Sequence, residues 1–236
     1  MSTPAATTPP SAWWSLTVTT AIQAMVSMAL LTLPAMAPVA AQGLGVPPAL
    51  VGAYVALCYL AAMLSSLIGG TLVRRLGAIR VSQLGLALCA IGLLLCAVPW
   101  LPAVALGALC IGAGYGPITP ASSHLLALTT PAHRMALVFS IKQTGVPAGG
   151  MLAGALVPGL SLWLGWQGTL AVVAGVCAVC AVLSQPLRTG SMKVNPYSAF
   201  DPLPADVVLA PAVDRWVETI DQWSPTVQTV FLTVGD

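Results

Sequence analysis

The chain has 236 residues, of which 58% are hydrophobic and only 6% are charged. Soluble domains carry about 25% charged residues, so this composition excludes a soluble globular protein with a polar surface. All six acidic residues lie at or beyond Asp201, which leaves residues 1–200 with seven of the eight basic residues and no carboxylate. Because long apolar runs separate those few cations, the pattern is typical of membrane loops and does not indicate nucleic-acid binding.

Residues 1–12 are rich in Thr, Pro and Ala and lack Lys and Arg. A cleavable signal peptide begins with positive charge, so we expect a disordered N-terminal lead that is retained in the mature chain.

Residues 13–188 contain six apolar stretches, each close to or above the length of about 20 residues that a helix needs to cross a bilayer. They are residues 15–41, 49–71, 81–99, 103–128, 136–159 and 167–187. Lipid offers no hydrogen bonds to the backbone, and the alternation of barrel strands is missing. The sequence therefore predicts an all-α fold, a polytopic transmembrane helical bundle of six spans.

The basic residues outside the spans fall into alternate connections. Those next to the spans are Arg74, Arg75, Arg80, Arg134, Arg188 and Lys193. The opposite connections, around residues 42–48, 99–103 and 160–167, contain no Lys or Arg but are flanked by Trp100, Trp163 and Trp166. By the positive-inside rule we expect a multi-pass protein of the cell inner membrane with both termini in the cytoplasm.

Paired prolines interrupt the first and the fourth spans, at Pro34 and Pro38 and at Pro117 and Pro120. Broken helices at matching depth are expected from an internal repeat of three plus three spans, and they point to a binding region. The alternative is that membrane helices simply tolerate proline.

Residues 189–236 are too polar to span a membrane and form an acidic tail, which we expect on the cytoplasmic side. Apolar residues recur at helical spacing between Val213 and Trp223, which predicts a short amphipathic helix. Anionic lipid would repel its acidic face, so we expect a protein contact or loose disorder. The change of character after Arg188 suggests a tail unrelated to the membrane domain.

The connection after the second span runs from Gly69 to Arg80 as GGTLVRRLGAIR. It resembles the signature loop of the major facilitator superfamily, although Arg74 stands where the family pattern has an Asp. The resemblance implies a gating loop, formed by Gly70, Arg74, Arg75, Gly77 and Arg80. The substitution at Arg74 removes the carboxylate that the family's gating latch would use.

The fourth and fifth spans resemble the glycine-rich helices of the same superfamily, and the resemblance covers residues 13–188. The matching residues, for which we expect close helix packing, are Gly112, Gly114, Gly116, Pro117, Gly145, Pro147, Gly149, Gly150 and Gly154. The resemblance implies a secondary transporter of twelve spans with its solute between two six-span halves. This chain would supply the N-terminal half, either as a truncated product or paired with a second half or with itself.

A polar residue inside a span indicates function because its burial in lipid is costly. The leading candidate is Lys142, which would attract an anionic solute if it faced a central cavity. The alternative is that its long side chain reaches the cytoplasmic interface. Neutral groups that would orient a solute, and a histidine that could carry a proton, complete the predicted substrate site: Gln143, Gln23, Tyr54, Tyr115 and His124.

The sequence predicts no metal site, no cofactor and no enzymatic activity. Its six cysteines lie in apolar segments, where cysteine acts as a small hydrophobic residue. The expected partners are the lipid bilayer, a small solute and a second half-transporter. The alternative function is a non-transporting remnant, or a six-span scaffold whose acidic tail engages a partner.

Overall fold

The computed structural model describes residues 12–185, so the acidic tail and nearly all of the predicted lead lie outside the described residues. Every regular element in that range is helical: α1 (Ala12–Ala35), α2 (Ala37–Leu44), α3 (Leu50–Leu76), α4 (Ala78–Cys96), α5 (Leu101–Tyr115), α6 (Ile118–Thr129), η1 (Ala132–Arg134), α7 (Met135–Gln143) and α8 (Gly145–Leu183). The predicted all-α class is confirmed for these residues.

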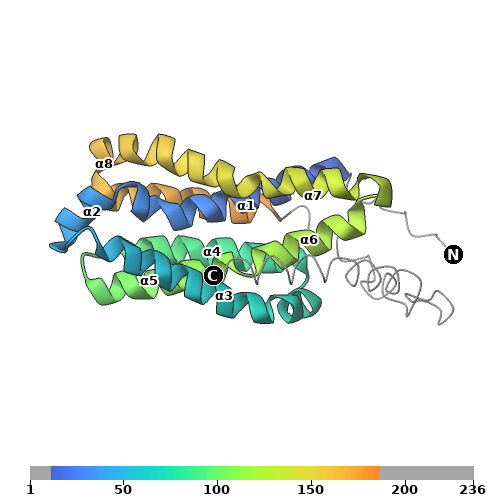
Figure 1. Ribbon diagram of the computed structural model, residues 1–236, viewed down its shortest axis with the longest axis horizontal. Helices are drawn as coiled ribbons and strands as arrows, with labels where there is room; N and C mark the ends of the chain where they lie inside the picture. The colour runs from blue at the N-terminus through green and yellow to red at the C-terminus, as the bar shows by residue number, and fades with distance from the viewer. Residues whose placement is uncertain (1–11, 186–236) are drawn as a thin grey trace, which may run out of the picture. The chain divides into compact units, whose positions relative to one another are not determined.

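Within residues 12–185, five helical stretches are long and apolar enough to cross a membrane. They are residues 13–35, 50–76, 78–96, 101–127 and 135–183. The last, of 49 residues, is far longer than one crossing requires. Its backbone leaves the helical region at Gly165, where φ is 69° and ψ is 172°. Glycine alone adopts this conformation without strain, and the two legs of α8 lie side by side (Figure 1).

The helices pack in two layers, one containing α1, α7 and α8 and the other α3 to α6 (Figure 1). In the first layer α1 packs most extensively on α8, and in the second α5 packs on α3 and α4. Contacts between α4 and α8 join the layers. α1, in the first predicted span, thus packs mainly against α8, and α5, in the fourth, against α3 and α4.

Both predicted proline breaks occur. The first span divides at Met36 into α1 and α2, and the fourth divides at Gly116 and Pro117 into α5 and α6. Proline has no N–H to donate to the carbonyl four residues earlier, so a helix bends or ends there. One such carbonyl belongs to Leu30, four residues before Pro34 inside α1.

The connection between α3 and α4 is shorter than predicted. The second span was expected to end at residue 71, but α3 continues to Leu76, and α4 begins directly after Gly77. At Gly77 φ is 85° and ψ is 151°, which permits the sharp turn. Val73 explains the extension because it is buried in a cluster with Ile79 and Leu125. Burial of this face keeps the basic segment helical.

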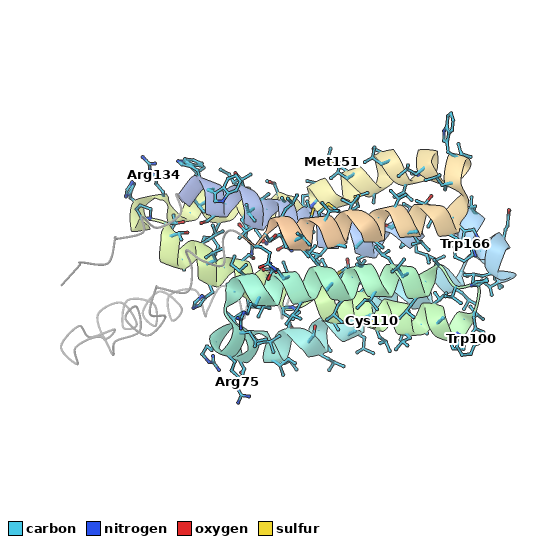
Figure 2. The ribbon with its side chains drawn as sticks, turned by 180° about the vertical axis from the view of Figure 1, so that it is seen from behind. Arg75, Trp100, Cys110, Arg134, Met151 and Trp166 are labelled. Atoms are coloured by element: carbon cyan, nitrogen blue, oxygen red, sulfur yellow. The ribbon has the colours of Figure 1, made fainter. Side chains whose placement is uncertain are left out.

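The bundle has an arginine-rich end, where the exposed Trp13 and Trp14 of α1 also lie, and an opposite end with tryptophans but no arginine among the described residues. Arg75 and Arg134 lie at one end, and Trp100 and Trp166 lie at the other (Figure 2). This is the separation that the alternating connections predicted. Trp100 is 62% exposed, whereas Trp166 is buried under Gly43 of α2. Trp166 is therefore part of the protein core and not of an exposed aromatic belt.

Candidate functional site

Two pairs of glycines bring α4 and α5 into backbone contact. A Cβ built on Gly92 would lie 2.6 Å from the carbonyl oxygen of Gly107, and one built on Gly107 would lie 2.5 Å from that of Gly92. Gly85 and Gly114 oppose each other in the same reciprocal way. The sequence analysis did not single out Gly85, Gly92 or Gly107, although the seven-residue spacing within each helix was visible. The contact fixes the position of α5 and hence of α6, which follows it.

A second face of α5 packs closely on α3 through Gly112 and Gly116. A Cβ on Gly112 would meet that of Ala61 at 2.8 Å, and one on Gly116 would collide with Ser65. The fold thus leaves no room for side chains at these two predicted packing positions.

The start of α8 packs on α1 in the same manner. A Cβ on Gly145 would lie 2.8 Å from the oxygen of Thr20, and one on Gly149 would lie 2.7 Å from the Cβ of Ser27. At Gly150 the nearest atom is at 3.3 Å, and at Gly154 nothing lies within 4 Å. The close approach therefore uses Gly145 and Gly149, which lie five residues before Gly150 and Gly154.

Lys142 lies in the last turn of α7, three residues before this contact. Its side chain is 1% exposed and crosses to α6. There Nζ donates a hydrogen bond to Ser123 Oγ at 3.1 Å and a longer one to the carbonyl oxygen of Thr119 at 3.4 Å. At a rise of 1.5 Å per residue, Lys142 is about 11 Å along the helix from Met135. The amine is thus held inside the bundle against α6.

Both acceptors of the Lys142 amine are neutral. An ammonium has three N–H donors, and residues 1–200 contain no Asp or Glu that could balance its charge. Burial of an isolated charge is costly, and an anion bound nearby would offset that cost. The described residues supply no such anion.

Gln23 lies on the other side of the α1–α8 contact. Its side chain is 1% exposed, and its Cβ would be 3.0 Å from a Cβ on Gly145. Its Oε1 forms no hydrogen bond within the described residues. A buried amide oxygen without a donor is a group that a ligand or a water molecule could satisfy.

Tyr54 has a structural partner. It is buried, and its hydroxyl donates to the carbonyl oxygen of Leu30 at 3.4 Å. This is the carbonyl that Pro34 cannot pair, so the tyrosine replaces the missing helix bond. The partner of Tyr54 is thus the backbone of α1.

Tyr115 lies at an open hollow of about 530 Å³ between α3 and the α5–α6 break. Its ring meets that of Tyr59 edge to face, with centroids 6.4 Å apart. Ser66 and Thr119 also line the hollow. Thr119 links the hollow to the buried amine because its carbonyl oxygen is an acceptor for Lys142.

The other candidates lie apart from this centre. Gln143 is exposed, and His124 is half-buried without a hydrogen bond in the described part of the chain. Of the predicted gating residues, Arg74 donates to Thr71 Oγ1 at 3.2 Å, and the side chains of Arg75 and Arg80 are exposed. Gly70, one helical turn before Arg74, is also exposed. Among residues 12–185, no cluster of His, Cys, Asp or Glu could hold a metal ion.

Comparison with known proteins identifies one family. The family model described as Major Facilitator Superfamily matches residues 16–229, a range that contains every candidate site residue named above. No curated protein matches the chain.

Proposed function

Because this chain belongs to the major facilitator superfamily, we propose that it acts as a secondary active transporter of a small anionic solute, of which it supplies an N-terminal six-span half. The family match supports transport in general. The anionic character of the solute rests on one observation, the buried side chain of Lys142 without a carboxylate in residues 1–200 to balance it.

The proposed count of six spans follows from dividing α8 at Gly165. The leg before Gly165 has 20 residues, or about 30 Å of helix, which matches the hydrocarbon core. An even number of spans places both termini on one side. With the arginine-rich end in the cytoplasm, both termini would be cytoplasmic in an inner-membrane protein.

The proposed solute site lies where α1, α6 and α7 meet. Lys142 supplies charge, and Gln23 supplies an amide oxygen without a partner in the described residues. The hydroxyls of Tyr115 and Thr119 line the neighbouring hollow, where they could orient a solute. An incoming anion would compete with the two α6 oxygens for the ammonium. The bonds to these oxygens are already charge-assisted, but an anion would add the attraction of a full opposite charge, which is stronger away from bulk water, so the exchange favours the anion.

Uptake into proteoliposomes tests this proposal. We expect the particle purified through the full chain, with any second half that co-purifies, to accumulate at least one member of a panel of labelled small carboxylates, phosphates and sulfonates. Lys142→Ala should abolish that uptake, whereas Ser140→Ala, which changes an exposed residue of the same helix, should leave it nearly unchanged. Equal uptake by wild type and Lys142→Ala, with both inserted to the same extent, would remove Lys142 from the solute site.

We further propose that the transporting assembly contains a second half, either another chain or a second copy of this one. In the superfamily's arrangement the solute lies between two halves. The protein mass of the particle in detergent, measured by light scattering, should then be at least twice the 24.0 kDa of one chain. A particle of one chain that still transports would contradict the need for a second half.

A further inference from the structure

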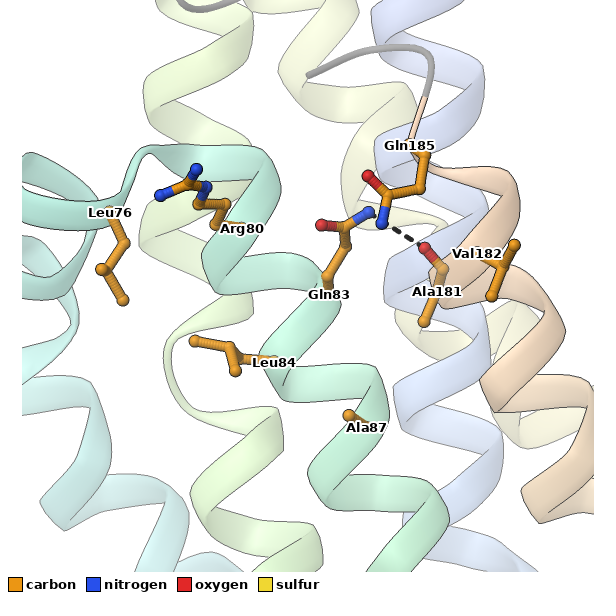
Figure 3. A pocket seen from close by; sticks show the side chains of 8 residues that line it. All are labelled: Leu76, Arg80, Gln83, Leu84, Ala87, Ala181, Val182 and Gln185. Atoms are coloured by element: carbon orange, nitrogen blue, oxygen red, sulfur yellow. Dashed lines mark hydrogen bonds between the residues drawn. The ribbon is translucent and has the colours of Figure 1, made fainter. Parts of the chain in front are cut away.

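A groove of about 440 Å³ lies between the start of α4 and the end of α8, away from the proposed solute site. Arg80, Gln83 and Gln185 give it a polar part. Gln83 and Gln185 point toward each other, and Arg80 extends away from them on the side of Leu76 (Figure 3). The groove's volume is in the range of small-molecule sites. The groove lies at the arginine-rich end of the bundle because Arg80 is in the first turn of α4.

The charge of this groove is positive and unbalanced. The Arg80 guanidinium forms no hydrogen bond or ion pair within residues 12–185, and no carboxylate exists in residues 1–200. The first N–H groups of α4 add partial positive charge beside it. A planar guanidinium with a fixed fork of donors is well suited to bind a phosphate through two hydrogen bonds.

The two glutamines have different roles. Gln83 Nε2 donates to the carbonyl oxygen of Ala181 at 3.0 Å (Figure 3). The backbone N–H of Gln185 bonds to Val182, one residue nearer than in a regular helix, so it does not pair with Ala181. Gln83 therefore caps the end of α8 and holds the groove's two walls together. The amide of Gln185 remains exposed as a further donor.

The rest of the groove is apolar. Its other lining residues are Leu76, Leu84, Ala87, Ala181 and Val182. Leu84, which is 48% exposed, and Ala87 lie about one and two turns further along α4 than Arg80, so an acyl chain could lie along them toward the membrane interior. A site with a cation at the interface and an apolar trough below it matches a phospholipid better than a free anion.

We propose that this groove binds an anionic glycerophospholipid, with its phosphodiester on Arg80 and one acyl chain along Leu84 and Ala87. The site is separate from the solute site, and it does not depend on transport. Its occupant would brace the ends of α4 and α8 at the cytoplasmic interface.

Native mass spectrometry of the full chain, titrated with phosphatidylglycerol in detergent, measures this binding directly. We expect Arg80→Gln to weaken phosphatidylglycerol binding about tenfold, the loss expected for one hydrogen bond to a charged group. Arg134→Gln removes an arginine at the same end of the bundle but outside the groove, and it should change binding less than twofold. Equal affinities for the two variants would overturn the assignment.

Two further arms distinguish a lipid from a free phosphate. Leu84→Trp fills the apolar trough and should weaken lipid binding, whereas Leu94→Trp, at a similarly exposed site on α4 outside the groove, should not. A tenfold excess of glycerol 1-phosphate should fail to displace the lipid. Displacement by glycerol 1-phosphate, or equal binding by the two tryptophan variants, would show that the site does not recognise the acyl chain and would overturn the lipid proposal.

Discussion

Replacing Gly92 with alanine should destabilise the packing of α4 on α5. The new Cβ would lie 2.6 Å from the oxygen of Gly107 and 2.6 Å from Cγ1 of Ile111, where ordinary contacts begin at 3.4 Å. The methyl group cannot turn away, and one obstacle is backbone, so the two helices must separate by close to an ångström. Overpacking of this kind costs about 1–3 kcal/mol.

A matched control isolates the packing effect. Alanine favours a helix over glycine by up to about 1 kcal/mol, and this gain opposes the clash. Gly175 in α8 is a suitable reference because a Cβ there would meet nothing within 4 Å. Gly175→Ala should keep the gain without the clash, so the two variants should differ by about 1–3 kcal/mol.

Unfolding of the detergent-solubilised chain by SDS, followed by tryptophan fluorescence, gives the free energies. We expect the midpoint for Gly92→Ala to fall below that of wild type and the midpoint for Gly175→Ala to stay level or rise. Equal stability of the two variants would show that α4 and α5 do not approach each other as closely as the reciprocal glycine contacts require.

Two other variants test local backbone features in the same assay. Tyr54→Phe should cost about 1 kcal/mol because it leaves the carbonyl four residues before Pro34 without a donor, whereas Tyr59→Phe should cost nothing measurable; equal losses would refute the role of the Tyr54 hydroxyl. Gly77→Ala should cost about 1–3 kcal/mol because φ at this position is 85°, while Gly52→Ala, within α3 and free of neighbours, should not destabilise the chain.

The membrane-spanning segments could be predicted from sequence because the bilayer imposes one physical requirement on each of them. Long apolar runs must be helical in lipid, and each predicted span is helical in the part of the chain that the structure describes. The first and fourth are divided near their prolines, and the last two lie almost entirely within one stretch of 49 residues. The ends were predicted less well because hydropathy reports partition into lipid and not backbone geometry. Arg74 and Arg75 lowered the hydropathy of a segment that stays helical, whereas the turn at Gly165 falls within the predicted connection around residues 160–167.

The sequence alone could not predict which glycines of different helices contact each other. Seven residues separate Gly85 from Gly92, and seven separate Gly107 from Gly114, but the sequence does not say that the two pairs face each other in antiparallel register. The small-residue pair that drew attention, Gly150 with Gly154, follows the actual contact. A spacing of four residues recurs on every face of a glycine-rich helix, so spacing alone does not identify the contacting face.

The Lys142 side chain is a similar case, because its position in the span allowed either a central cavity or the interface. The structure places its amine against Ser123, whose hydroxyl was visible in the sequence without a reason to connect it to Lys142. The choice depends on the break between α5 and α6, which sets the direction of α6. Sequence patterns within single spans contain no information about that direction.

The pairing of Lys142 with Ser123 leads to a prediction that separates charge from packing. Ser123→Ala should cost about 1.5–3 kcal/mol in the unfolding assay because it removes one of two acceptors from a buried ammonium. The same change made in Lys142→Met should cost almost nothing, because no charge then needs the hydroxyl. Any gain in helix propensity from serine to alanine is the same in wild type and in Lys142→Met. It therefore cancels when the two costs of Ser123→Ala are compared in a double-mutant cycle. If Ser123→Ala costs the same with and without the lysine, the hydroxyl does not hold the amine, and Lys142 must find its stabilisation elsewhere.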